Sequence, residues 1–232
     1  MQNELVVKSN QVIEASYRLS VVEQRVVLSA IAKIPEMSEV SDDEIYTVSV
    51  QDLQALGVHE KTAYRDLKEA VNRLYERSIS LDIDDKLIKM RWVQRIEFTD
   101  NQGIIALRFS KDILPFISNV KANFTQYMLS EVSKMQGAYS VRVYELLVQY
   151  KITGERSISI EDFNFQTNFR TFNGTHAEKI FENKNNINIE NAKINSKDNL
   201  ELKINNKFKV FDFKNLIFNE EDKSIISDNE SS

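Results

Sequence analysis

Residues 49–78, SVQDLQALGVHEKTAYRDLKEAVNRLYERS, decide the fold that the sequence predicts. Ser49 and Asp52 are typical of a helix N-terminus, and Gly57 is typical of a helix C-terminus. The rest of the segment predicts a longer helix, because its apolar residues recur at helical spacing: Ala63, Leu67, Ala70, Val71 and Leu74. Two helices joined by a tight turn that contains glycine indicate a helix-turn-helix.

The segments before this motif predict a helix and a strand. Residues 21–34 carry apolar residues at helical spacing, and Ser20 with Glu23 matches a capping box. Pro35 predicts the end of this helix. The alternation in residues 45–50, IYTVSV, predicts a short strand.

The segments after the motif predict β structure. Residues 79–83 and 87–98 flank a turn at Asp84-Asp85-Lys86, and a second turn leads into residues 104–109, IIALRF. A helix-turn-helix followed by a β-hairpin wing is a winged helix. We therefore predict an N-terminal winged-helix domain over residues 1–115.

A similar order of elements recurs further along the chain. Residues 124–135 and 138–154 predict two helices, and Gly154 ends the second. SISIEDF, residues 157–163, then repeats the pattern of TVSVQDL, residues 47–53. Repeated order indicates a duplicated winged helix.

The second copy departs from the first after Phe165. The following text is rich in asparagine and has no apolar stripe at helical spacing, although the alternation around Asn205 and Asn206 predicts a hairpin. We therefore predict an α+β protein of tandem winged-helix domains, the second divergent or incomplete over residues 116–213. Residues 214–232 predict a disordered tail.

Composition limits the classes of function. The chain has 232 residues, of which 42% are hydrophobic, and no cysteine, which excludes disulfides, thiolate catalysis and cysteine-ligated zinc. The first residues do not match a secretion signal, and no apolar run reaches the roughly 18 residues of a membrane span, so we expect a cytoplasmic protein with no membrane partner. A net charge of -5 argues against a general polyanion-coating protein but permits a local basic face for DNA.

The candidate DNA-binding face lies at the start of the second helix of the helix-turn-helix. There the spacing places four residues away from the apolar stripe: Lys61, Thr62, Arg65 and Lys68. The first turn of such a helix meets base edges or phosphates, where arginine and threonine can donate hydrogen bonds. The alternative is a solvated helix face. On the wing, Lys86, Lys89 and Arg91 are candidates for phosphate contact, or else lysines that deter strand-edge pairing.

Nothing in the sequence predicts a catalytic centre. Asp82, Asp84 and Asp85 cluster as metal ligands do, but no further ligand follows at a loop spacing. The two histidines, His59 and His176, do not form an H-x-H pattern, and no phosphate-binding G-x-x-x-x-G-K-[ST] loop occurs. We therefore predict that the protein is not an enzyme and uses no catalytic residue, cofactor or metal.

Three segments resemble the iteron-binding plasmid replication initiators, a family with two tandem winged helices. They are residues 6–34 at the start, LRFSKDILPFI at residues 107–117, and VRVYELL at residues 141–147. The resemblance implies that the second winged helix places a recognition helix in the major groove of origin repeats. It implies that the first supports dimerisation and a secondary contact with double-stranded DNA. The lysine- and arginine-rich second recognition helix of the family is not visible after Phe165.

The function implied is plasmid DNA replication initiation by binding origin repeats and the protein's own operator. In such initiators monomers open the origin with the host replication initiator and helicase, whereas homodimers repress the promoter. The hairpin in residues 91–109 is a possible pairing surface for the dimer. Two alternatives stay open: a DNA-binding repressor or copy-control protein without initiation activity, and a dimerising interaction module that no longer binds DNA specifically.

Overall fold

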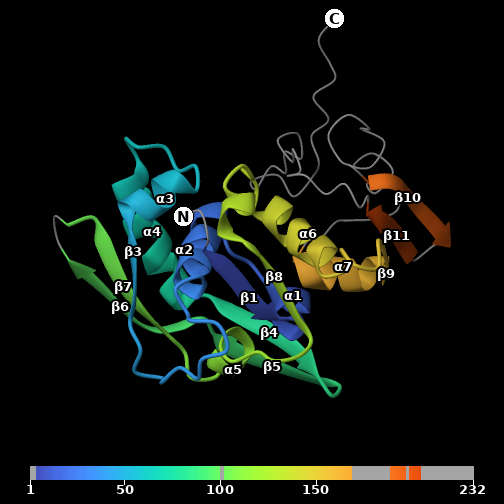
Figure 1. Cartoon of the computed structure of the whole chain (residues 1–232), viewed down its shortest axis with the longest axis horizontal. Helices are drawn as coiled ribbons and strands as arrows, with labels where there is room; N and C mark the ends of the chain where they lie inside the picture. Colours follow the sequence, from blue (N-terminus) through green and yellow to red (C-terminus); the bar gives the residue numbers. More distant parts are fainter. Residues whose placement is uncertain (1–3, 100–101, 169–188, 197–198, 205–232) are drawn as a thin grey trace, which may run out of the picture. The chain divides into compact units, whose positions relative to one another are not determined.

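The computed structural model describes residues 4–99, 102–168, 189–196 and 199–204 (Figure 1). The chain divides into two compact units, Met1–Lys134 and Met135–Ser232. Within the described ranges, no helix is both long enough and apolar enough to span a membrane. Both units combine helices with antiparallel strands, which confirms the predicted α+β class.

The first unit contains the predicted winged helix (Figure 1). In chain order its elements are α2 (Val21–Ile31), β3 (Tyr46–Ser49), α3 (Val50–Ala55), α4 (Ala63–Glu76), β6 (Val93–Thr99) and β7 (Ile104–Phe109). The three strands form an antiparallel sheet of order β3-β7-β6, so the first strand pairs with the last. Hairpin β6–β7, which follows the helices, is the wing.

Side-chain caps begin two of these helices, as the sequence indicates. Ser20 Oγ accepts from the Glu23 N–H at 3.3 Å, and Glu23 Oε2 accepts from the Ser20 N–H at 2.6 Å. Ser49 Oγ accepts from the Asp52 N–H at 3.1 Å, and Asp52 Oδ2 accepts from the Ser49 N–H at 2.8 Å. These bonds satisfy donors that the first helical turn leaves unpaired, a contribution of about 1 kcal/mol per cap.

The predicted apolar stripe of α4 faces the core. All five of its residues are at most 1% exposed: Ala63, Leu67, Ala70, Val71 and Leu74. Leu53 and Leu56, from α3 and its C-cap, are fully buried, and α4 packs against both α2 and α3. Each buried leucine contributes roughly 1.5–3 kcal/mol, so packing holds the two helices of the motif at a fixed angle.

A second hairpin precedes the wing and belongs to another sheet. β4 (Ser78–Ile83) and β5 (Lys86–Arg91) pair with β2 (Ser16–Tyr17) in the order β2-β4-β5. Their tight turn is the predicted one, with φ of 52° at Asp84 and 58° at Asp85. The prediction that Lys86, Lys89 and Arg91 lie on the wing is therefore wrong, since β5 is not part of the β3-β7-β6 sheet.

Trp92 separates the two hairpins, because it lies between the end of β5 and the start of β6. Its side chain is fully buried, and its ring packs edge-on against Tyr17 with centroids 5.0 Å apart. Burial of this residue interrupts the strand predicted over residues 87–98. The chain leaves one sheet at Arg91 and enters the other at Val93.

The segment at residues 124–135, predicted as a helix, begins with a strand instead. β8 (Phe124–Met128) pairs with β1 (Leu5–Ser9), and only a short 3₁₀ helix, η1 (Leu129–Val132), follows. Burial alternates along β8, with Thr125 and Tyr127 buried, which is the period of a strand. Because β8 completes a sheet with the start of the chain, the first unit continues to Lys134, beyond the boundary predicted at residue 115. The short helices α1 (Asn10–Glu14) and α5 (Leu114–Ile117) complete this unit.

The second unit repeats the order of the first. Its elements are α6 (Ala138–Val148), β9 (Glu155–Ser159), α7 (Ile160–Thr167), β10 (Ile189–Ser196) and β11 (Asn199–Ile204). The sheet order is β10-β11-β9, so here too the strand before the capped helix pairs with the last strand. Ser159 Oγ caps α7 by accepting from the Asp162 N–H at 2.9 Å. This arrangement is that of a second winged helix.

Part of the second unit lies outside the described residues. This part includes residues 169–188, between α7 and β10, and the predicted tail at 214–232. The sequence predicts a hairpin around Asn205 and Asn206, which also lie outside; within the described part, β11 is the second strand of a hairpin with β10. Of the second domain predicted over residues 116–213, residues 116–134 belong to the first unit, and the end at residue 213 stays a prediction.

Candidate nucleic-acid interface

The helix-turn-helix of the first unit is anchored at the start of α3. Lys33 Nζ donates to the Thr47 carbonyl at 2.7 Å and to Asp52 Oδ2 at 2.9 Å. Burial alone would raise the pKa of Asp52, but the hydrogen bonds from Lys33 and Ser49 outweigh it and hold the pKa below its ordinary value. The carboxylate is therefore charged at neutral pH and ties α3 to the end of α2.

The turn between α3 and α4 depends on Gly57. Its φ of 89° is in the left-handed region, and a Cβ at this position would lie 2.7 Å from the Ser133 carbonyl oxygen. The same carbonyl accepts from Arg25 Nη2 at 3.5 Å. Burial lowers the pKa of Arg25 to about 10, so its guanidinium stays charged at neutral pH. The turn is thus confined by a close approach that only glycine allows.

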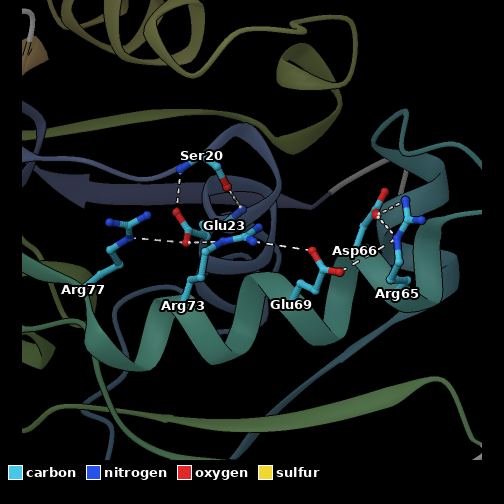
Figure 2. A network of polar contacts seen from close by, with 7 residues as sticks. All are labelled: Ser20, Glu23, Arg65, Asp66, Glu69, Arg73 and Arg77. Atoms are coloured by element: carbon cyan, nitrogen blue, oxygen red, sulfur yellow. Dashed lines mark hydrogen bonds and ion pairs between the residues drawn. The ribbon is translucent and has the colours of Figure 1, made fainter. Parts of the chain in front are cut away.

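The C-terminal half of α4 is tied to the start of α2 by a buried carboxylate (Figure 2). Glu23 is 0% exposed, and its Oε1 accepts from Arg73 Nε and from Arg77 Nε, each at 3.3 Å. Its other oxygen accepts from the Ser20 N–H in the capping box. A buried charge needs such hydrogen bonds to replace its contacts with water. These bonds therefore fix the orientation of α4 relative to α2.

The structure brings the four residues predicted on the helix together at its N-terminal end. Lys61, Arg65 and Lys68 are exposed, whereas Thr62 is half-buried and donates from Oγ1 to the His59 carbonyl at 3.3 Å. All four lie within the turn before α4 and its first two turns. The basic residues thus face solvent, as the apolar stripe predicts.

Arg65 shares its surface with two carboxylates. Its Nη2 and Nε lie 3.2 and 3.3 Å from Asp66 Oδ1, and Nε lies 4.0 Å from Glu69 Oε1 (Figure 2). Glu69 also lies 3.6 Å from Arg73 Nη1. We call these four residues the compensated flank of α4. From residue 60 to 77 the charges nearly cancel, since five are basic and four acidic: Lys61, Arg65, Lys68, Arg73 and Arg77 against Glu60, Asp66, Glu69 and Glu76.

The other side of the helix carries lysines and aromatic rings, which we call the lysine flank: Lys61, Tyr64, Lys68 and Phe98. Lys68 Nζ lies 5.9 Å from the centroid of the Phe98 ring of β6. Tyr64 and Lys68 are one turn apart on α4, and Tyr64 and Phe98 are 46% and 36% exposed. Among the described residues, neither Lys61 nor Lys68 makes an ion pair.

The turn end of the wing, where β6 leads into β7, lies against this end of the helix-turn-helix. The Val50 N–H donates to the Gly103 carbonyl at 2.8 Å. A Cβ on Gly103, whose φ is 63°, would lie 3.1 Å from Val50 Cγ2 and 4.0 Å from Tyr64 Cδ2. The wing and the first turn of α4 therefore form one continuous surface. Sequence reasoning missed Tyr64 and Phe98, because strand alternation alone does not place Phe98 beside a helix.

The three basic residues of β5 lie elsewhere in the unit. Arg91 Nη1 donates to the Tyr75 carbonyl and to Glu76 Oε2, both at 3.2 Å, so it contacts the C-terminal end of α4. α4 has 14 residues, and at ~1.5 Å per residue its two ends are about 20 Å apart. Lys86 and Lys89 are exposed on the same strand. These residues do not join the cluster at the first turn, and their contact with DNA stays a prediction.

Across the part of the chain that the structure describes, no three histidine, cysteine, aspartate or glutamate side chains converge as metal ligands do. The features that remain are an exposed helix end, a wing packed beside it, and lysines without carboxylate partners. Such a surface can contact nucleic acid through phosphates and aromatic stacking.

Comparison with known proteins shows that the chain is similar to replication initiation proteins. A family model described as "Initiator Replication protein, WH1" matches residues 5–148. A replication initiation protein of Escherichia coli is 28% identical over 177 residues, covering 70% of this chain and 54% of that protein. The PI protein of Escherichia coli is 25% identical over 146 residues, covering 53% of this chain and 48% of that protein. The chain spans about half the length of these two relatives.

A solved structure shows the same fold. The crystal structure of the Pi initiator protein in complex with iteron DNA has a TM-score of 0.71 to this chain at 19% sequence identity. The match covers 88% of this chain and 99% of that one. It extends over both units, which supports the duplicated winged-helix architecture.

Proposed function

The chain belongs to the initiator replication protein family, and on that premise we propose that it initiates plasmid DNA replication by binding repeated DNA at an origin. It also binds its own operator in this proposal. The action is docking on double-stranded DNA, with no bond made or broken. The observation that carries the proposal is the exposed N-terminal end of α4, with Lys61, Arg65 and Lys68, beside the turn end of the wing.

The two units have different tasks in this proposal. In the first, Lys61, Thr62, Arg65 and Lys68 meet the phosphate backbone, and contacts of this kind position a protein on the duplex. Base reading falls to the second unit, in the segment that follows α7. The fold likeness to an initiator whose structure contains iteron DNA supports the binding of repeated DNA.

Partners of the protein are also part of the proposal. The host replication initiator and helicase are recruited once the origin is bound. A homodimer, in equilibrium with monomers, forms through the hairpin β6–β7, since β6 is the edge strand of its sheet. Sedimentation at tens of micromolar that shows only monomers would remove the dimer, because complexes with Kd near ~1 µM persist at that concentration.

The function is tested with the full chain and DNA carrying the tandem repeats next to its own gene. We expect binding to these repeats at ~150 mM salt at least about tenfold tighter than to a scrambled duplex. We also expect the chain, supplied in trans, to maintain a plasmid that carries the same DNA. Binding without maintenance would favour a repressor, and equal affinity for both duplexes would favour an interaction module.

A further inference from the structure

We infer that Asp66 and Glu69 determine DNA specificity by occupying Arg65, so that the first unit holds DNA of arbitrary sequence only weakly through its lysine flank. The inference rests on the proposed DNA-binding function and assigns a role to two carboxylates within the candidate interface.

Arg65 is occupied from two directions. Asp66 Oδ1 accepts from both Nη2 and Nε, at 3.2 and 3.3 Å, and Glu69 Oε1 approaches Nε at 4.0 Å. The side chains of Arg65 and Glu69 are 67% and 55% exposed. Exposed pairs of this kind add little to folding stability, so stability gives no strong reason for two acids around the most exposed arginine of the helix.

The carboxylates act on any phosphate that approaches Arg65. They lie within 4.0 Å of the guanidinium, well inside the ~10 Å screening length at 0.1 M salt. A phosphate bound to Arg65 would therefore meet two negative charges at short range. Arg65 then neutralises little of the phosphate charge, and few counterions are released at this point.

The lysine flank has the opposite character. Lys68 lies over the Phe98 ring at 5.9 Å, and within the described residues no carboxylate pairs with it or with Lys61. A lysine held by an aromatic face keeps its full charge for a phosphate. The first unit therefore contacts the backbone mainly through two lysines beside the wing, although three basic residues are exposed at the start of α4.

This one-sided contact has a consequence for selectivity. Affinity for arbitrary DNA rises with each phosphate that is neutralised, and genomic DNA offers a vast excess of competing sites. Keeping Arg65 compensated limits that affinity while leaving recognition by the other parts of the protein unchanged. Asp66 and Glu69 thus act through Arg65 as positioning residues for specificity.

The test uses the full chain and a mixed-sequence duplex without repeats, with affinity measured over a series of salt concentrations. The double variant Asp66→Asn with Glu69→Gln should bind this duplex about five- to tenfold more tightly at 50 mM salt, and the slope of log K against log salt should steepen by about 0.9. Asp42→Asn is the control, because it removes one exposed acid that is remote in sequence from α4. Its effect should be less than about twofold, since within the described residues the Asp42 carboxylate forms no ion pair with a basic residue of α4.

Two further variants test whether the effect of the carboxylates depends on Arg65. In the background Arg65→Gln, the same two substitutions should give a gain of less than about twofold, because Arg65 is absent and Arg73, the other partner of Glu69, still donates to Glu23. Lys68→Gln alone should flatten the salt slope by about 0.9. Asp66 is also an acid in the first turn of α4, a place that favours helix formation, so melting curves are recorded for each variant; a purely structural role would shift melting but leave the salt slope unchanged.

The outcomes separate this inference from the proposed function. If the chain selects repeats but the double variant behaves like Asp42→Asn, or if the gain survives in Arg65→Gln, the inference is wrong and the function stands. If the double variant gains affinity and slope but no repeat is ever preferred, the proposed initiator function fails, and what stands is that the carboxylates limit the affinity of Arg65 for DNA of arbitrary sequence. If no form of the chain binds duplex DNA at 50 mM salt, both are wrong.

Discussion

The two units share an order of strand, capped helix and hairpin but differ in the buried polar groups that orient their helices. In both, a strand leads into a helix capped by serine, Ser49 in one and Ser159 in the other, and that strand pairs with the last strand of its sheet. The helix ends beside a residue with positive φ, Gly57 at 89° or Asn168 at 56°. Among the described elements, the two units therefore share this part of the backbone plan.

The difference lies in what is buried. In the first unit the centre is the carboxylate of Glu23, which accepts from two arginines of α4. In the second unit the centres are Arg142 and Arg156, which donate to the backbone oxygens of Gln166 and Leu146 at 2.8 Å each. The buried carboxylate of the first unit therefore holds α4, the second helix of the helix-turn-helix. In the second unit, Arg142 holds α7, the helix that Ser159 caps. A duplicated fold can keep its topology while the polar groups that orient its helices change completely.

The largest effect is expected in the second unit, from Arg142→Met. Arg142 and Glu145 are 2% and 1% exposed and lie 2.8 Å apart, so the substitution leaves a buried carboxylate without its main partner. We expect the free energy of unfolding of this unit to fall by about 3–5 kcal/mol. Circular dichroism during denaturation should show an early transition, while the fluorescence of Trp92, the chain's one tryptophan, reports the first unit.

The matched control replaces both members of the pair. Arg142→Met with Glu145→Met removes the charge and its partner together, and most of the lost stability should return. A double variant as unstable as the single one would mean that packing or the bond to Gln166, not charge compensation, is what the unit needs.

In the first unit, Glu23→Ala is expected to be the most damaging of the polar changes. It removes the capping box and both bonds to Arg73 and Arg77, which together contribute about 2–3 kcal/mol. The Trp92 transition should move to lower denaturant. Glu69→Ala, which also removes a partner of Arg73 but from an exposed site, should change stability by less than about 1 kcal/mol. Equal losses in the two variants would show that burial of Glu23 is unimportant.

The turns of the two units can be compared by placing alanine in each. Gly57→Ala adds a Cβ that would lie 2.7 Å from the Ser133 carbonyl oxygen at a φ of 89°, and we expect a loss of about 2 kcal/mol. Asn168→Ala places alanine at a φ of 56° and should cost less, about 1 kcal/mol. Differential scanning calorimetry resolves these losses. A larger loss at Asn168 would mean that the second turn is the more constrained one.

The smallest expected effect concerns pH and Asp52. Its folded-state pKa is below the ~3.9 of an unfolded aspartate, so its contribution is present above that pH and is lost as pH falls through the folded pKa. Asp52→Asn should lower stability at pH 7 by under about 1 kcal/mol and reduce the loss on acidification below pH ~4. Unfolding followed by Trp92 fluorescence at both pH values checks this. If Asp52→Asn lost as much stability on acidification as the unsubstituted protein, Asp52 would not contribute to the pH dependence of stability.

Local patterns predict the helix-turn-helix well, because caps and apolar spacing act over a few residues. Ser20, Ser49 and the stripe of α4 lie where their patterns indicate. Long-range pairing cannot be predicted in this way. β8 is a strand because β1, far away in the sequence, pairs with it, and the run at residues 87–98 divides because Trp92 packs on Tyr17.

The same limit applies to the candidate site. Exposure of Lys61, Arg65 and Lys68 follows from the helical stripe and is predictable. Their different surroundings are not, since the pairing of Arg65 with Asp66 and Glu69 and the contact of Lys68 with Phe98 depend on rotamers and on a strand that follows α4 in the chain. The sequence alone therefore predicts equal contact with DNA for all three residues.

The central claim is that the N-terminal end of α4 contacts DNA, and the salt dependence of repeat binding tests it most directly. We compare Lys61→Gln with Lys68→Gln, as a double variant, against Lys86→Gln with Lys89→Gln, which removes the same charge from β5. The account predicts that the α4 double variant loses at least about tenfold in affinity and flattens the salt slope by about 1.8, more than the β5 double variant does. An equal or larger loss from the β5 lysines, or an unchanged slope in the α4 variant, would contradict it.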